Sequence, residues 1–237
     1  MQRPPISYVL ADQERMTAAK SYFAWQNRLV VRELGRRVLE IGCGLGNFTS
    51  MLLDRDQIVA LDVEPDCVER LKSRYPNQNN LHAFCCDVND PEFSGLKRFN
   101  SDSCVCLNVL EHIEDDRKAL EGMAGAISSG GVIVLIVPAF QALYGPIDRN
   151  LGHYRRYNRK MAGELARVTG LRIRKAHYMN TVGFFGWWVN AHILKREAQS
   201  EGQIEFFDKY IVPPMAWIEG IVKPFFGQSL FLVLEKP

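Results

Sequence analysis

The stretch RRVLEIGCGLGNF, residues 36–48, constrains the fold of this chain more than any other part of the sequence. A short apolar run leads directly into Gly42, Gly44 and Gly46, and the pattern that follows predicts a helix over residues 45–53. A strand, a glycine turn and a helix in this order let backbone approach a ligand closely, because glycine has no Cβ. The spacing is G-x-G-x-G, one residue shorter than the dinucleotide fingerprint G-x-G-x-x-G, so the turn alone does not identify the ligand.

Two further apolar runs end in an acid. The segment QIVALD ends at Asp62, about 20 residues past Gly42, and LHAFCCD ends at Asp87. An acid at the tip of the second strand of a nucleotide-binding fold reaches a ribose. Strands predicted over residues 101–108 and 132–137 follow, and they alternate with helical segments. This alternation predicts an α/β fold with a doubly wound parallel sheet.

These three motifs, in this order, resemble the class I S-adenosylmethionine-dependent methyltransferases, over residues 36–180. The stretches NVLEHIEDD and GHYRRY resemble a bacterial subgroup whose acceptors are mostly unassigned. The resemblance implies S-adenosylmethionine as cofactor, S-adenosylhomocysteine as product, and no metal. It also implies a seven-stranded Rossmann-like sheet with an antiparallel last strand. The cofactor-binding residues that it implies are Glu40, Gly42, Gly44, Gly46, Asp62, Val63, Asp87, Val88 and Asn108.

The resemblance also assigns parts of the cofactor to residues. The backbone at Gly42 and Gly44 would face the methionine portion, and Asn108 would line the same end. Asp62 would accept hydrogen bonds from the ribose hydroxyls, and Asp87 from the adenine amino group. A strand-end aspartate is otherwise often a turn or cap residue.

The 237 residues suit a single domain with four parts. These are an N-terminal helical lid at 1–35, a cofactor-binding core at 36–180, an insertion at 183–226 that caps the substrate, and the last strand at 229–237. A helical pattern over residues 12–34 supports the lid, although a plain surface helix would give the same pattern. The lid residues to test are Tyr8, Tyr22 and Trp25.

Methyl transfer requires an aligned acceptor and, for a phenol, enol or acid, a general base. His112 follows the predicted fourth strand and is a candidate base, although it would also suit a helix cap or the core. The arginines of GHYRRY could clamp a carboxylate or phosphate, or could only hold their loop through ion pairs. We therefore select His112, His153 and Tyr157 as catalytic candidates. The substrate candidates are Glu111, Tyr154, Arg155, Arg156, Trp187 and Trp188.

Aromatic side chains are dense within residues 183–226, the insertion. This density is typical of a hydrophobic acceptor pocket, a homodimer face or a patch that contacts a membrane surface peripherally. Ordinary core packing would also explain it. The sequence does not choose among these roles.

Composition excludes several classes of function. A net charge of +2 provides no basic field for nucleic acid. The N-terminus lacks an apolar run of signal-peptide length, and no run reaches a membrane span, so we expect a cytoplasmic protein. None of the six cysteines forms C-x-x-C, which argues against a zinc site.

The sequence thus predicts a methyltransferase that acts on a small aromatic or amphipathic metabolite by O- or C-methylation, with N-methylation as a further option. An RNA methyltransferase is one alternative, although Asn108 is followed by Val109 and Leu110 rather than by two prolines. A nicotinamide oxidoreductase and a non-catalytic cofactor-binding scaffold are alternatives from other classes. Asp87 and the early third glycine argue against the oxidoreductase.

Overall fold

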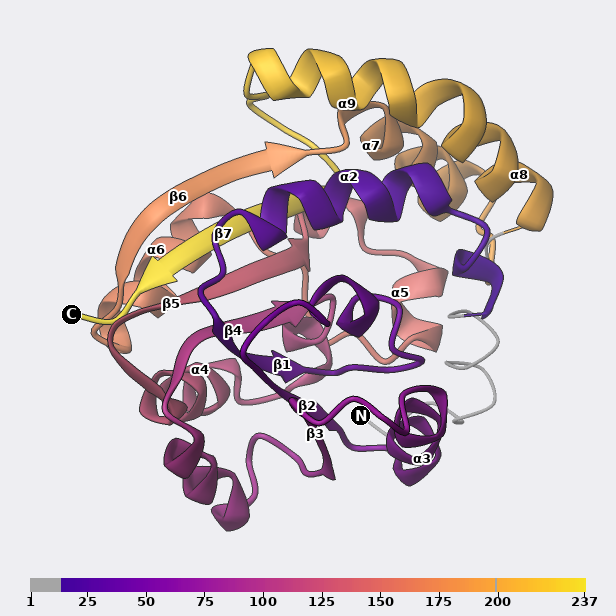
Figure 1. The fold of residues 1–237 in the computed structure, drawn as a ribbon. Coiled ribbons are helices and arrows are strands. Elements are labelled where there is room, and N and C mark those ends of the chain that lie inside the picture. Colours follow the sequence, from indigo (N-terminus) through magenta and orange to yellow (C-terminus); the bar gives the residue numbers. More distant parts are fainter. Residues whose placement is uncertain (1–13, 199) are drawn as a thin grey trace.

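A seven-stranded sheet organises residues 14–198 and 200–237, the parts of the chain that this computed structural model describes (Figure 1). The strand order is β3-β2-β1-β4-β5-β7-β6, and β7 runs antiparallel to both β5 and β6. The order and the antiparallel last strand confirm the predicted doubly wound sheet. The strands are β1 (Arg37–Ile41), β2 (Gln57–Asp62), β3 (Leu81–Cys85), β4 (Ser101–Leu107), β5 (Ile127–Pro138), β6 (Arg172–Met179) and β7 (Ser229–Glu235).

Helices connect the strands and cover both faces of the sheet. The α-helices are α2 (Lys20–Val31), α3 (Pro65–Arg74), α4 (Asp116–Ala126), α5 (Pro146–Asn150), α6 (Arg159–Val168), α7 (Thr181–Trp188), α8 (Glu201–Phe206) and α9 (Val212–Ile221). Short 3-10 segments lie at Thr49–Met51, Pro91–Phe99, Leu110–His112 and Gln141–Leu143, and π-helical segments at Val189–Ile193 and Phe207–Ile211. Within the described ranges, no helix is long and apolar enough to span a bilayer.

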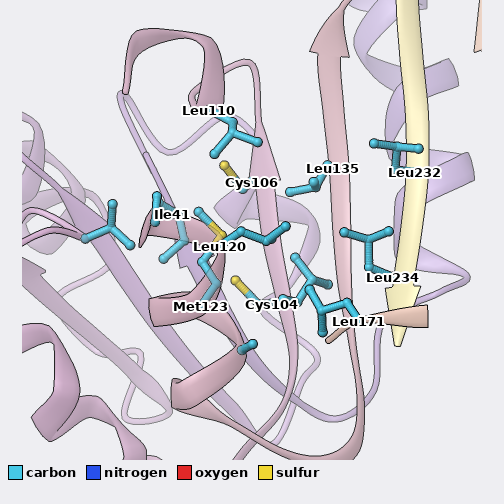
Figure 2. Packing of buried hydrophobic residues seen from close by; sticks show 14 of the residues in the cluster. Ile41, Cys104, Cys106, Leu110, Leu120, Met123, Leu135, Leu171, Leu232 and Leu234 are labelled. Atoms are coloured by element: carbon cyan, nitrogen blue, oxygen red, sulfur yellow. The ribbon is translucent and has the colours of Figure 1, made fainter. Parts of the chain in front are cut away.

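Two apolar cores form because side chains alternate between the faces along each strand. On one face, Leu39 of β1 shares a core with Leu120 and Met123 of α4, and Figure 2 shows these two α4 side chains pointing toward the strands. On the other face, Val38 packs in a core with Trp25 of α2. Full burial of such a side chain contributes about 1.5–3 kcal/mol, so both helix layers hold the sheet rigid beneath its functional edge.

The six cysteines are free. Four of them, Cys43, Cys67, Cys104 and Cys106, are buried and pack as small apolar groups. Cys85 is exposed because it ends β3, which lies at the edge of the sheet.

The helix predicted over residues 45–53 was wrong. The chain leaves the glycine turn through further turns and forms only the 3-10 segment Thr49–Met51. Gly44 and Gly46 have φ angles of 49° and 77°, a left-handed backbone that a right-handed helix cannot contain. The helix predicted over residues 12–34 is also shorter than expected, because α2 ends at Val31.

Helices α7, α8 and α9 form the predicted helical insertion between β6 and β7, and α9 packs against α2 (Figure 1). Buried Asp208 joins the insertion to the N-terminal helix, since its carboxylate accepts hydrogen bonds from the backbone N–H groups of Ser21 and Tyr22 at 2.9 and 2.8 Å. N–H groups in the first turn of a helix have no partner within it, so Asp208 caps α2 from a distant part of the chain. Tyr8 lies outside the described residues.

Candidate active site

A cavity of about 1460 Å³ opens along the carboxyl ends of the parallel strands. Strand tips and the turns after them supply Gly42, Asp62 and Asn108 to its wall. Helix α2 and the insertion form the opposite wall, for example through Tyr22 and Phe185. In open α/β sheets, ligands bind at this edge, so the cavity has the position expected of an active site.

Most of the predicted cofactor residues line this cavity: Glu40, Gly42, Gly44, Asp62, Val63, Asp87, Val88 and Asn108. Gly46 does not. A Cβ at Gly46 would lie 2.5 Å from the Cδ1 atom of Leu71, so packing against α3 explains this glycine. Its predicted cofactor contact has no support from its position.

Hydrogen bonds to β2 fix the conformation of the glycine turn. The N–H groups of Gly42 and Cys43 both donate to the carbonyl of Leu61 at 2.8 Å, and Gly44 donates to Oδ2 of Asp62 at 2.7 Å. The other Asp62 oxygen, Oδ1, accepts from the N–H of Glu64 at 3.0 Å. Asp62 therefore shapes the turn in addition to the ribose contact predicted for it. Burial raises the pKa of Asp62, and these backbone hydrogen bonds oppose that rise.

Glu40 lines the cavity and is 3% exposed. Its Oε2 atom accepts a hydrogen bond from the buried hydroxyl of Thr49 at 2.7 Å. Burial raises the Glu40 pKa to about 7, with the Thr49 hydrogen bond opposing this rise and the charge of Asp62 adding to it. A carboxyl group in this environment is well suited to a cationic partner, which would favour its ionised form.

Asp87 and Asn108 adopt local turn conformations beside the cavity. Oδ1 of Asp87 accepts from the backbone N–H of Asn89 at 2.9 Å, the turn role that the sequence left open for it. Asn108 has a φ of 54°, and its N–H donates to the carbonyl of Ile136 at 2.8 Å. This conformation turns the chain sharply after β4 and brings the next residues into the cavity.

Glu111 and His112, which follow β4, form a polar cluster with His153 from the loop after α5. Nε2 of His153 lies 4.0 Å from Oε1 of Glu111, and the rings of His112 and His153 meet edge to face with centroids 4.6 Å apart. Nδ1 of His153 lies 2.8 Å from Oδ1 of Asp148, which also accepts from Nε of Arg156 at 2.9 Å. Glu111, His112, His153 and Arg156 all line the cavity.

Burial dominates the electrostatics of this cluster. It raises the pKa of Glu111 to about 7, although the nearby His153 and Arg156 act in the opposite direction. It lowers the pKa of His112 to about 3, and His153 adds to this effect. Burial alone would raise the pKa of Asp148, but His153 and Arg156 outweigh it and keep that pKa low. A histidine with so low a pKa is a weak base, so this buried environment does not favour His112 acting alone as the general base.

Tyr157 and Arg155 lie away from the cavity lining. The phenol of Tyr157 is buried and donates to Oδ2 of Asp116 at 2.9 Å, and burial raises its pKa far above the usual range. Arg155 forms an ion pair with the same Asp116 oxygen at 2.8 Å. Both side chains therefore hold the loop to α4. For Arg155 this is the second of the two roles considered from the sequence, an ion pair that holds the loop. Tyr154 and Arg156 line the cavity, as a substrate role requires.

The aromatic side chains of the insertion divide into two groups. Trp187 lines the cavity, and the guanidinium of Arg156 lies over its ring at 4.8 Å. Trp188 is not among the lining residues and instead contacts His192. Trp217 and Phe225 are 71% and 88% exposed. The insertion thus provides an inner wall for a ligand and an outer apolar surface.

Two functional carboxylates were missed from the sequence. Asp148 orients His153, and its only signal was an acid five residues before that histidine in the same polar loop. Asp208 holds the N-terminus of α2 beside the cavity by accepting a hydrogen bond from Ser21. Nothing in the sequence linked these two residues, which are 187 positions apart. Of the residues predicted for the lid, Tyr22 lines the cavity, whereas Trp25 packs in the core.

Comparison with known proteins agrees with this geometry. A family model described as a methyltransferase domain matches residues 39–133. A probable S-adenosylmethionine-dependent methyltransferase of Mycolicibacterium smegmatis is 27% identical over 161 residues, which cover 67% of this chain and 58% of that protein. The chain therefore spans less than two thirds of the length of this relative.

Solved structures show the same fold. A methyltransferase in complex with the Haloferax volcanii Trm112 methyltransferase activator has a TM-score of 0.67 at 15% identity, over 100% of both chains. The N-methyltransferase NodS of Bradyrhizobium japonicum WM9, in complex with S-adenosylhomocysteine, has a TM-score of 0.55 at 17% identity, over 90% of this chain and 86% of that one. Residues 39–133 thus match a methyltransferase domain, and the chain is similar to S-adenosylmethionine-dependent methyltransferases in sequence and in fold.

Proposed function

We propose that this chain transfers a methyl group from S-adenosylmethionine to a small amphipathic acceptor by in-line displacement. The observation that carries the proposal is a single cavity in which the glycine turn and the Glu111–His112–His153 cluster share one space. Ligand pockets commonly measure about 300–1,000 Å³. A cavity of about 1460 Å³ therefore has room for a cofactor and a second molecule side by side.

The lining residues fit the cofactor chemically. Gly42 and Gly44 offer an open backbone, Asp62 offers a carboxylate for ribose hydroxyls, and Glu40 offers a buried carboxyl group for an ammonium. When bound, S-adenosylmethionine supplies a methyl group on a positively charged sulfur that is also a good leaving group. The protein then has to align the acceptor and exclude water, and α2 and the insertion form the wall that excludes it.

The polar cluster supports a role on the acceptor side. Glu111, His112 and His153 offer a carboxyl group and two imidazoles in one buried corner of the cavity. Together they form the centre that takes the proton from an acceptor hydroxyl or enol. Asp148 positions His153 for this task, because a carboxylate accepts the Nδ1–H and leaves Nε2 free.

The other residues that line the cavity are both apolar and polar, which suits an amphipathic acceptor. Trp187, Phe206 and Phe207 supply aromatic surface, and Arg156 adds a positive charge beside Trp187. Asp148 already engages this guanidinium, so Arg156 contributes a polar edge more than a free anion clamp. On the outer surface, the homodimer and membrane-contact roles remain predictions. The activator bound to the Haloferax neighbour adds a protein partner as a further candidate for this surface.

Isothermal calorimetry with S-adenosylhomocysteine, with NADH as the control ligand, tests the cofactor first. We expect micromolar binding of S-adenosylhomocysteine alone. Binding of NADH instead would favour an oxidoreductase and refute the proposal.

A methyl-transfer assay then tests the acceptor class with a panel of phenols, enols, amphipathic alcohols and carboxylic acids, alongside unmodified RNA. Turnover on a small molecule supports the proposal, and turnover on RNA alone would redirect it to the nucleic-acid alternative. Cofactor binding without turnover on any acceptor would favour the non-catalytic scaffold.

A further inference from the structure

The cluster at residues 111, 112 and 153 has the composition of a metal site. One side-chain ligand atom from each of Glu111, His112 and His153 lies within 4.8 Å of the other two. Glu111 and His112 come from the 3-10 segment after β4, and His153 comes from the loop after α5. The sheet and the loop hold the three groups from separate parts of the chain, which is how proteins build ligand sets with fixed geometry.

Both imidazoles are oriented to leave one nitrogen free. Nδ1 of His153 donates to Oδ1 of Asp148 at 2.8 Å, because an ionised carboxylate can only accept. The backbone of Leu151 acts on the His112 ring in the direction that favours an N–H facing this backbone. The second ring nitrogen of each histidine then carries a lone pair. Most histidines that bind a metal through one ring nitrogen donate the N–H of the other nitrogen to a carboxylate or a carbonyl in this way.

Glu111 provides an independent sign that a ligand is needed. The residue is 1% exposed and lines the cavity, and its Oε2 atom has no hydrogen-bond partner among the described residues. A buried carboxylate oxygen without a partner is costly, and a cation would satisfy it.

We propose that Glu111, His112 and His153 bind one divalent transition-metal ion inside the cavity. Two imidazoles and one carboxylate select zinc or divalent iron, cobalt and nickel over magnesium or calcium. Donor atoms around such an ion lie about 2.0–2.2 Å from it, so neighbouring ligands sit about 3.3 Å apart. Atoms within 4.8 Å reach this spacing through side-chain movements on the order of 1 Å. Three protein ligands leave at least one position open to the cavity, as in catalytic sites.

The role of this ion rests on the proposed methyl transfer, whereas its binding does not. With the ion bound, the three side chains would no longer take the proton themselves. An acceptor oxygen at the open position would instead become more acidic and lose its proton to solvent. Its lone pair then forms the bond to the methyl carbon. The carbon–sulfur bond breaks with its electrons passing to sulfur, which leaves a neutral thioether and a methyl ether or ester.

The test titrates Co²⁺ into the full chain after treatment with a chelator, because the visible spectrum of Co²⁺ reports its ligands. We expect one Co²⁺ per chain, without the strong absorption typical of thiolate ligands. Glu111→Gln and His153→Gln should each lower the affinity by about 100-fold or more, and Asp148→Asn by about 10–100-fold. His82→Gln on β3 and Cys85→Ser are the matched controls, and both should bind like the unaltered protein.

Calorimetry with S-adenosylhomocysteine and thermal unfolding on the same samples separate the two proposals. Glu111→Gln keeps the shape of the side chain, so it should retain its fold and its S-adenosylhomocysteine affinity, and it decides the test if His153→Gln does not fold. Absence of Co²⁺ binding, or equal binding by Glu111→Gln, overturns the metal site. S-adenosylhomocysteine binding without Co²⁺ binding overturns the metal site alone, and the reverse overturns only the methyltransferase proposal.

Discussion

Replacement of Glu40 by Gln should stabilise the ligand-free protein at neutral pH. The carboxyl group is 3% exposed, and its removal from water raises the pKa from 4.5 to about 7. A displacement of roughly 2.5 pH units, at about 1.36 kcal/mol per unit, corresponds to about 3 kcal/mol between the protonated and ionised forms. The amide of Gln is neutral at every pH and can still accept the hydrogen bond from Thr49.

The raised pKa of Glu40 determines how its contribution to the free energy of unfolding changes with pH. The unfolded chain releases the Glu40 proton near pH 4.5, whereas the folded chain keeps it until about pH 7. Between these values the folded state binds more protons, so the contribution of Glu40 to stability falls as the pH rises and is lowest above pH 7. The Gln variant should therefore match the unaltered protein most closely near pH 5 and exceed it by about 3 kcal/mol at pH 8, or about 6–12 °C in Tm.

Urea unfolding of both proteins at pH 5, 6, 7 and 8, without cofactor, measures this difference. Glu205→Gln, an exposed position on α8, is the matched control and should give a difference that stays within about 0.5 kcal/mol. The reasoning is refuted if the difference between Glu40→Gln and the unaltered protein is the same at pH 5 and pH 8. A Gln variant that is less stable at pH 8 would also refute it.

Three further substitutions test individual assignments. Asp62→Ala should weaken S-adenosylhomocysteine binding by about 1–3 kcal/mol and also lower stability, because the N–H groups of Gly44 and Glu64 lose their acceptor; unchanged affinity in calorimetry would exclude the ribose contact. His112→Ala should lower turnover while S-adenosylhomocysteine affinity stays near that of the unaltered protein, and equal turnover in both proteins would make His112 structural. Tyr157→Phe should cost about 1–2 kcal/mol in urea unfolding without loss of turnover, since its hydroxyl bonds Asp116 outside the cavity; a large loss of turnover at unchanged stability would restore its predicted catalytic role.

The sheet edge was predictable because local patterns report it. An apolar run followed by glycine or an acid marks the end of a strand, and parallel strands bring these ends to one edge. The residue pattern alone was therefore enough to place Asp62 and Asn108 beside Gly42. The failed helix after the turn has an equally local cause, since the left-handed φ of Gly46 could not be read from residue type alone.

The sequence by itself determined the fold class, the likeness to methyltransferases and the edge of the sheet that carries the cavity, because apolar periodicity and glycine spacing act over a few residues. Only the tertiary structure decided which residues of the GHYRRY loop face the cavity. His153 lines the cavity and Tyr157 packs in the core, because the loop has no regular period and its course depends on Asp148 and Asp116, acids at different distances along the chain. Glu111 lies beside His153, Asp148 and Arg156 only because the fold brings α5 and the loop after it to the end of β4, and its burial and its unpartnered oxygen are properties of this tertiary arrangement.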